Sequence, residues 1–294
     1  MDGAAHTPVS LRARAEEAAA ALPPLLMHAE WLAATVMMGE HGRRRAGPGD
    51  AFWQYRPAQP GDARRSIDWR QSARGDDHFV REREWQAAQT LMLWVDDAAS
   101  MRFAAGGRPS KLRRAQTLAL ALAALAVRAG ERVGLAALPE PPRAGRAQLA
   151  RMADALMEGG EAPDYGAPRP RVMPLGARAV FLSDFLGDPA PLRDALTRAA
   201  DRGVEGVMLQ VLDPEEEAFP YDGRTLFESM SGAIRFETLK AGALRDDYLG
   251  RLAARRAELR ELARRTGWRV LVHRTDASAA SALLALHAAL GPRR

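Results

Sequence analysis

The chain has 294 residues, 47% of them hydrophobic, which is enough to bury the core of one large α/β domain with or without an extension. It contains no cysteine, which excludes disulfides and thiolate chemistry and favours a reducing compartment. The formal net charge is only +5, and the arginines alternate with acids, so a long basic surface for nucleic acid is not expected.

The first 88 residues differ in pattern from the rest, and we expect them to form an extension. Helices are expected over residues 10–22 and 25–38, and neither these nor any later segment forms an uncharged apolar run of about 18 residues. The N-terminus also lacks the pattern of a signal peptide, so the prediction is a cytoplasmic protein that does not span a membrane. Five of the six tryptophans lie by residue 94, which predicts a small aromatic core in this extension: Trp31, Trp53, Trp69, Trp85 and Trp94.

From residue 89 to residue 294 short apolar segments alternate with longer helical ones. The expected strands are residues 91–95, 132–138, 179–182, 206–212 and 268–273. The expected helices are residues 110–128, 146–157, 190–202, 243–266 and 278–290. Strands that alternate with helices predict right-handed crossovers and a mostly parallel sheet with helices on both faces. Between residues 214 and 240 the pattern changes, and the pieces 224–228 and 233–238 predict an inserted antiparallel hairpin.

Four aspartates follow predicted strands directly, namely Asp96, Asp184, Asp213 and Asp276. Ligands of such sheets bind outside the carboxyl ends of the strands, so all four should lie at one edge. Asp213 and Asp276 are interpreted as a helix N-cap or turn residues. Asp96 and Asp184 are the candidates for a functional site.

The densest motif lies in the extension, where aspartates and arginines interleave closely between residues 62 and 74. Such residues are suited to bidentate ion pairs. Either they brace a turn and one another, or they form a docking surface for a partner or an anion. The residues concerned are Asp62, Arg65, Asp68, Trp69, Arg70 and Arg74.

This motif, PGDARRSIDWRQSAR at residues 60–74, resembles the signature of the bacterial "domain of unknown function 58" family. FWQYR before it and FVREREW after it are similar too, as are the later FLSDF, QVLDP and FPYDGRTLFE, so the resemblance covers residues 40–290. It implies a von Willebrand factor A-like, Rossmann-type α/β domain with an N-terminal extension. It also implies association with AAA+ ATPases of the MoxR class, and no established enzymatic activity.

Von Willebrand A-like domains carry a metal-ion-dependent adhesion site whose ligands come from a DxSxS motif, a later threonine and a later aspartate. The resemblance transfers three of these ligands to this chain, as Asp96, Ser100 and Asp184. Ala98 stands at the middle serine, and no threonine lies between Thr117 and Thr197. Two of the three hydroxyl ligands are therefore missing, which predicts a degenerate site. We expect no resident cofactor, and Mg²⁺ is the one candidate ion.

Other chemistry is not indicated: no phosphate-binding G-x-x-x-x-G-K-[ST] loop exists, and the six histidines show no metal spacing. The prediction is a non-enzymatic interaction protein, an adaptor or chaperone partner of a MoxR-type ATPase that acts on an unknown client. The ATPase would bind residues 62–74 and the Asp96/Asp184 edge through exposed carboxylates. The alternatives are a Mg²⁺-dependent enzyme or ligand binder that uses those two aspartates, and an anion or nucleic-acid binder through residues 43–45 and 64–74.

Overall fold

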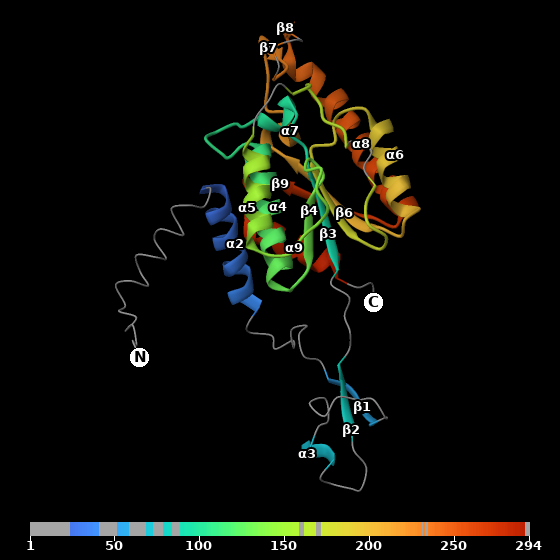
Figure 1. Ribbon diagram of the computed structural model, residues 1–294. Helices are drawn as coiled ribbons and strands as arrows, with labels where there is room; N and C mark the ends of the chain where they lie inside the picture. The colour runs from blue at the N-terminus through green and yellow to red at the C-terminus, as the bar shows by residue number, and fades with distance from the viewer. Residues whose placement is uncertain are drawn as a thin grey trace, which may run out of the picture. The chain divides into compact units, whose positions relative to one another are not determined.

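The computed structural model describes residues 24–40, 52–58, 69–72, 79–83, 89–158, 162–168, 172–230, 232 and 235–291 (Figure 1). The chain divides into two compact units, Arg43–Gln89 and a larger unit formed by Met1–Gly42 with Thr90–Arg294. Helix α2 (Pro24–Glu40) therefore belongs to the larger unit, and the expectation that residues 1–88 form a single extension is wrong for this helix. The predicted helix at residues 10–22 lies outside the described residues.

The core of the larger unit is a five-stranded sheet in which every neighbouring pair is parallel. Its strands are β3 (Thr90–Val95), β4 (Arg132–Leu135), β5 (Arg178–Ser183), β6 (Glu205–Leu212) and β9 (Arg269–Arg274), in the order β4-β3-β5-β6-β9. All five strands were predicted, so the expected α/β class with a parallel sheet is confirmed.

Apolar residues cover both faces of this sheet because successive side chains of a strand point to opposite sides. In β3, Leu91 and Leu93 join one hydrophobic cluster and Met92 joins the other. In β5, Val180 and Phe181 divide in the same way, and Phe181 packs edge-on against Trp268, with ring centroids 4.9 Å apart. A sheet buried on both faces in this way needs a layer of helices on each side.

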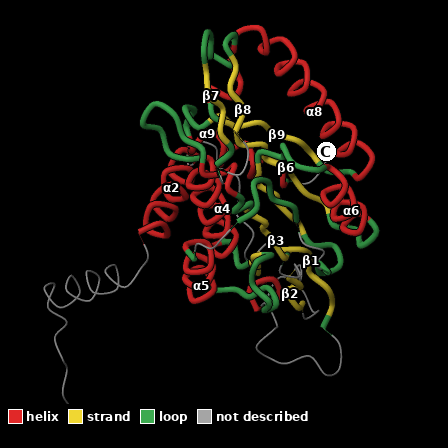
Figure 2. The backbone as a smooth tube through the Cα atoms, turned by 90° about the horizontal axis from the view of Figure 1, so that it is seen from above, coloured by secondary structure: helices red, strands yellow, loops and turns green. Residues whose placement is uncertain are grey.

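Helices provide those two layers, as Figures 1 and 2 show. One face is covered by α4 (Lys111–Arg128), α5 (Arg146–Met157) and α9 (Ala279–Leu290), and the other by α6 (Pro189–Ala200) and α8 (Arg245–Thr266). Helix α2 packs on α4 and α9 with six buried apolar residues: Leu25, Leu26, Ala29, Leu32, Ala33 and Val36. In the described part of the chain, no helix is both long and apolar enough to cross a membrane.

The carboxyl edge of the sheet carries several short elements. The 3-10 turn η2 (Ala99–Arg102) follows β3, and α7 (Pro214–Ala218) follows β6. Next come β7 (Thr225–Glu228) and β8 (Arg235–Thr238), which pair as an antiparallel hairpin, then the 3-10 turn η3 (Ala241–Leu244). The predicted hairpin insertion is confirmed, and α7 with the two 3-10 turns was not predicted. After β3 the chain adds β4 on one side and β5 on the other, so the switch point of the topology lies between β3 and β5.

The smaller unit contains β1 (Phe52–Pro57) and β2 (Phe79–Arg83), paired antiparallel, and the single turn α3 (Trp69–Ser72). Ser72 Oγ accepts a hydrogen bond of 2.9 Å from the Phe79 backbone N–H. The expected aromatic core is not found for three of its five tryptophans: Trp31 lies exposed on α2, Trp69 is 56% exposed, and Trp94 packs in the larger unit. The side chains of Trp53 and Trp85 lie outside the described residues.

Candidate functional site

Asp96 lies directly after β3, at the switch point, and is 1% exposed. Its backbone N–H donates to Leu182 O at 2.9 Å, which extends the β3–β5 ladder by one residue. Its Oδ1 accepts from the Ala98 N–H at 2.9 Å, and its Oδ2 accepts from Ser183 Oγ at 2.6 Å. Burial raises the pKa of Asp96, and these two hydrogen bonds only partly offset that effect. Both oxygens of the Asp96 carboxylate therefore already accept a hydrogen bond from within the chain.

Asp184, at the end of the neighbouring β5, is also 1% exposed and is paired with a lysine. Its Oδ2 accepts from Lys111 Nζ at 2.9 Å, and its Oδ1 accepts from the Leu186 N–H at 3.0 Å. Lys111 is fully buried, and its Nζ also donates to Glu216 Oε1 at 2.6 Å. Burial lowers the pKa of Lys111, but the two carboxylates outweigh it, and the net pKa lies above the ordinary value. The ammonium group therefore stays charged at neutral pH.

Helix α7 covers this edge with three consecutive glutamates, each paired with a cation from outside the helix: two cations lie at or just before the start of α4, and the third lies in α8. Glu215 pairs with Arg108 at 3.4 Å, Glu216 pairs with Lys111, and Glu217 pairs with Arg256. The shared consequence is that α7 is held to the sheet edge along its whole length.

Asp213 begins α7 as its N-cap, which confirms the structural interpretation of this residue. Its side chain accepts from the Glu215 N–H at 3.0 Å, and Glu216 Oε2 accepts from the Asp213 N–H at 2.8 Å, so the two residues form a capping box. Arg108 and Thr275 also donate to the buried Asp213 carboxylate. Asp276 lies in a turn, as the structural interpretation predicted, and its side chain pairs with Arg274.

The loop of residues 162–168 covers Asp96 from a second direction. The Ala99 and Ser100 N–H groups donate to Pro163 O and Asp164 O, each at 2.9 Å. A Cβ atom at Gly166 would lie 1.9 Å from Asp96 Oδ1, so only glycine allows the backbone to approach this carboxylate so closely. Asp96 is therefore enclosed by the chain itself.

Backbone strain gathers at the same edge. In the described chain two residues other than glycine have positive φ: Phe185, at 53°, directly after Asp184, and Phe219, at 43°, directly after α7. This left-handed conformation costs a non-glycine residue roughly 1–2 kcal/mol. Both rings are buried, Phe185 beside Trp94 and Phe219 beside Tyr248, so apolar packing supports the strained turns.

The structure brings together two of the three predicted metal ligands. Asp96 directly follows β3 and Asp184 directly follows the adjacent β5, and Ser183, next to Asp184 in the chain, donates to Asp96. Ser100 lies in η2, and its buried Oγ has no hydrogen-bond partner within the described residues, a feature that by itself favours a missing ligand. Sequence reasoning missed Lys111 and Glu216. The signal available for Lys111 was its rarity, because Lys240 is the only other lysine.

The donors at this edge do not fit a Mg²⁺ ion. A Mg²⁺ ion held by Asp184 Oδ2 at about 2.1 Å would lie within about 5 Å of Lys111 Nζ, since Nζ and Oδ2 are 2.9 Å apart. Repulsion between this dication and the ammonium group would be about 7 kcal/mol at an effective dielectric of about 20. Apart from Ser100, the predicted hydroxyl ligands are absent, and Ser183 already donates to Asp96.

The expected docking surface is corrected in one respect and lies partly outside the described residues. The carboxylates of Asp96 and Asp184 are buried, so the expectation that they are exposed to a partner is wrong. The reason is tertiary: α7 and the loop of residues 162–168 cover the edge that strand order alone leaves open. Trp69 and Arg70 lie exposed on α3. The remaining motif residues lie outside the described part: Asp62, Arg65, Asp68 and Arg74.

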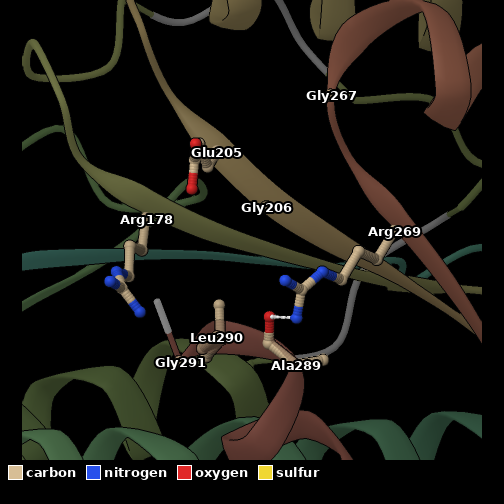
Figure 3. A pocket seen from close by; sticks show the side chains of 8 residues that line it. All are labelled: Arg178, Glu205, Gly206, Gly267, Arg269, Ala289, Leu290 and Gly291. Atoms are coloured by element: carbon tan, nitrogen blue, oxygen red, sulfur yellow. Dashed lines mark hydrogen bonds between the residues drawn. The ribbon is translucent and has the colours of Figure 1, made fainter. Parts of the chain in front are cut away.

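A small pocket lies at the opposite, amino edge of the sheet (Figure 3). Arg178, Glu205 and Arg269 line it from the first residues of β5, β6 and β9, and the end of α9 closes it. Arg269 Nη1 donates to Ala289 O at 2.6 Å, so this arginine holds the end of the helix. The pocket is separate from the site at the carboxyl edge, and a structural role for Arg269 explains its geometry.

The described residues define a class of protein: a doubly wound parallel α/β domain whose carboxyl edge is closed by internal ion pairs. Residues 54–258 match the family described as "Protein of unknown function DUF58", and the chain belongs to this family. Uncharacterized proteins of Mycobacterium bovis and Mycobacterium tuberculosis are each 29% identical to it over 300 residues, covering 92% of this chain and 90% of theirs.

Two solved structures are similar at low sequence identity. One is an aerotolerance-related membrane protein from Bacteroides fragilis, with a TM-score of 0.40 and 14% identity over 69% of this chain and 98% of that one. The other is the conserved hypothetical protein BatB from Bacteroides thetaiotaomicron, with a TM-score of 0.39 and 15% identity over 68% of this chain and 98% of that one.

Proposed function

We propose that this protein is a cytoplasmic, non-enzymatic interaction module with a degenerate metal-ion-dependent adhesion site, which serves a MoxR-type AAA+ ATPase as adaptor. The observation that supports it best is the closure of the carboxyl edge. In an α/β enzyme this edge holds the substrate, but here Asp96 and Asp184 are each 1% exposed and bonded to neighbouring groups of the chain. A carboxylate that is to act as a general base or nucleophile must reach its substrate.

The surface above the closed edge has the composition of a protein interface. Four large apolar side chains are exposed in or next to the β7–β8 hairpin: Leu226 (57% exposed) and Phe236 (52%) in the strands, Met230 between them, and Leu239 just after β8. The register places Leu226 opposite Glu237 and Phe236 opposite Phe227, so both faces of the hairpin present an apolar group. The ion pairs Arg224–Glu237 and Glu228–Arg235 border them. Apolar groups bordered by charges are typical of a docking surface.

The choice of partner depends on the family resemblance and on what the chain lacks. The sequence contains no phosphate-binding loop, so remodelling of a client would need an ATPase from another chain. The resemblance implies a MoxR-type enzyme. In this proposal the hairpin and the residue 62–74 motif bind the ATPase, and their mixed charges make the association weaken as the salt concentration rises.

The test is co-purification with a MoxR-type ATPase of the same organism at low and high salt, with and without ATP. We expect the wild-type protein to bind at low salt, and the Leu226→Asp/Phe236→Asp double variant to lose binding while its melting temperature is unchanged. Val172→Asp is the matched control, because Val172 is 74% exposed in a loop away from the hairpin, and it should bind like the wild type. No association in any nucleotide state at low salt would refute the adaptor function.

Asp68→Ala separates the two interpretations of the motif. If Asp68 braces the arginines, the substitution should lower the free energy of unfolding by roughly 1–3 kcal/mol. If the motif is a docking surface, stability should be retained while binding of the ATPase is lost.

A further inference from the structure

Lys111 occupies an unusual position for a lysine. It is the first residue of α4, after the N-cap Ser110, and its side chain extends to the carboxyl edge with no exposed surface. Lysine is among the residues that are almost never fully buried unless paired. Here its Nζ lies 2.9 Å from Asp184 Oδ2 and 2.6 Å from Glu216 Oε1. The group therefore joins a strand end to α7 by charge.

Position 111 holds a lysine in a chain whose cations are otherwise almost all arginines. The chain has 42 lysines and arginines together, and two are lysines, so arginine is the default cation of this protein. Arginine serves at the neighbouring positions: Arg108 binds Asp213 and Arg256 binds Glu217. A guanidinium group is a wide planar fork, whereas an ammonium group is a compact point charge. The Asp184–Glu216 gap holds the one type of side-chain cation that resembles a metal ion in shape and charge density.

We propose that the Lys111 ammonium group is the resident cation of this edge and replaces the divalent ion, bridging Asp184 and Glu216 so that α7 closes without metal. The negative charge of the two carboxylates is then compensated by a group covalently attached to α4. This assignment explains why two hydroxyl ligands can be absent without leaving buried carboxylates unpaired. It does not depend on the identity of the partner, and it predicts that closure of the edge is insensitive to chelators.

The test compares Lys111→Ala with Lys240→Ala, a matched control that removes the only other lysine, which is exposed. In chelator, Lys111→Ala should lower the melting temperature by on the order of 10 °C because it breaks a buried ion pair. Millimolar Mg²⁺ or Mn²⁺ should restore several degrees, and the Lys111→Ala/Asp184→Asn double variant should show no such recovery. The wild type and Lys240→Ala should be unaffected by chelator or metal.

Three outcomes would overturn the proposal. The first is a rise in the wild-type melting temperature with Mg²⁺ that Asp184→Asn abolishes. The second is a melting temperature of Lys111→Ala in chelator that equals the wild-type value. The third is a lowered melting temperature of Lys111→Ala that no divalent ion restores.

A second measurement covers the case in which Lys111→Ala does not fold. With two lysines in the chain, ¹⁵N-lysine labelling gives two Nζ signals that are easily assigned. In metal-free wild-type protein, Lys111 should show a slowly exchanging NH₃⁺ signal that added Mg²⁺ does not shift. A neutral amine, or a signal displaced by Mg²⁺, would contradict the assignment.

Discussion

Acidification should destabilise this protein through one histidine, His273, near the end of β9. The side chain is 6% exposed, and its Nε2 lies 3.2 Å from Arg114 Nη1. Burial first, and the positive charge of Arg114 second, lower the pKa of His273 from 6.5 to about 4. Because the pKa of His273 is lower in the folded than in the unfolded state, the folded state is favoured while this histidine is neutral. Its contribution to stability is complete above pH 6.5 and is lost as the pH falls toward 4.

The size of the effect follows from the shift. The difference between 6.5 and about 4 is about 2.5 pH units, and each unit corresponds to about 1.4 kcal/mol, so the full loss is about 3.5 kcal/mol. For a chain of this size that corresponds to a fall of roughly 10 °C in melting temperature. Asp213 and Asp276 do not contribute in this window, because their pKa values are lowered below 3.8 and they lose stabilisation only at lower pH.

The assay is urea unfolding of the wild type and of His273→Gln at intervals from pH 8 to pH 4. Glutamine keeps an acceptor for Arg114 but does not titrate, so the variant should lose about 3 kcal/mol less than the wild type over this range. Asp96 and Glu216, whose pKa values are raised by burial, act in the opposite direction and equally in both proteins. Parallel pH profiles of the two proteins would refute the reasoning.

Two further substitution pairs test the closed edge. Gly166→Ala places a Cβ atom 1.9 Å from Asp96 Oδ1 and should lower the free energy of unfolding by roughly 1–3 kcal/mol. Gly250→Ala, which has open space in α8, should raise it by up to about 1 kcal/mol. Equal effects of the two substitutions in chemical denaturation would contradict the close approach at Gly166. Asp213→Ala removes the N-cap of α7 and the hydrogen-bond acceptor of Thr275, and should lower the free energy of unfolding by about 2–3 kcal/mol. Asp276→Ala, in its exposed turn, should change thermal stability little. If Asp213→Ala left thermal stability unchanged, α7 would be held by its glutamates alone.

Much of the fold could be read from local pattern. The alternation of apolar segments with helical ones identified all five strands of the sheet and the hairpin, because a buried parallel strand is a short apolar run whatever lies beside it. The position of Asp96 and Asp184 at one edge followed from the same rule, since the carboxyl ends of parallel strands coincide. Helix α7 was not predicted, because a single turn of five residues carries no measurable periodicity.

The boundary of the extension was misplaced for a physical reason. The apolar residues of α2 indicate a helix, but they do not indicate which surface covers it. That surface is formed by α4 and α9, which lie roughly 90 and 250 residues further along the chain. The tryptophan count misled for the same reason, because nearness in sequence does not place Trp31, Trp69 and Trp94 in one core.

The sequence by itself determined the class of fold, the edge to which two aspartates belong, and the absence of two of the three hydroxyl groups that the family resemblance leads one to expect, since each depends on residue type and strand order alone. Only the tertiary structure decided what those aspartates do. Lys111 pairs with Asp184, 73 positions away in the chain, and with Glu216, 105 positions away, and no local pattern specifies such separations. A charged group is stable in the interior only when its partner arrives from elsewhere in the fold, so the cation at this edge was visible only after folding had brought α4, β5 and α7 together.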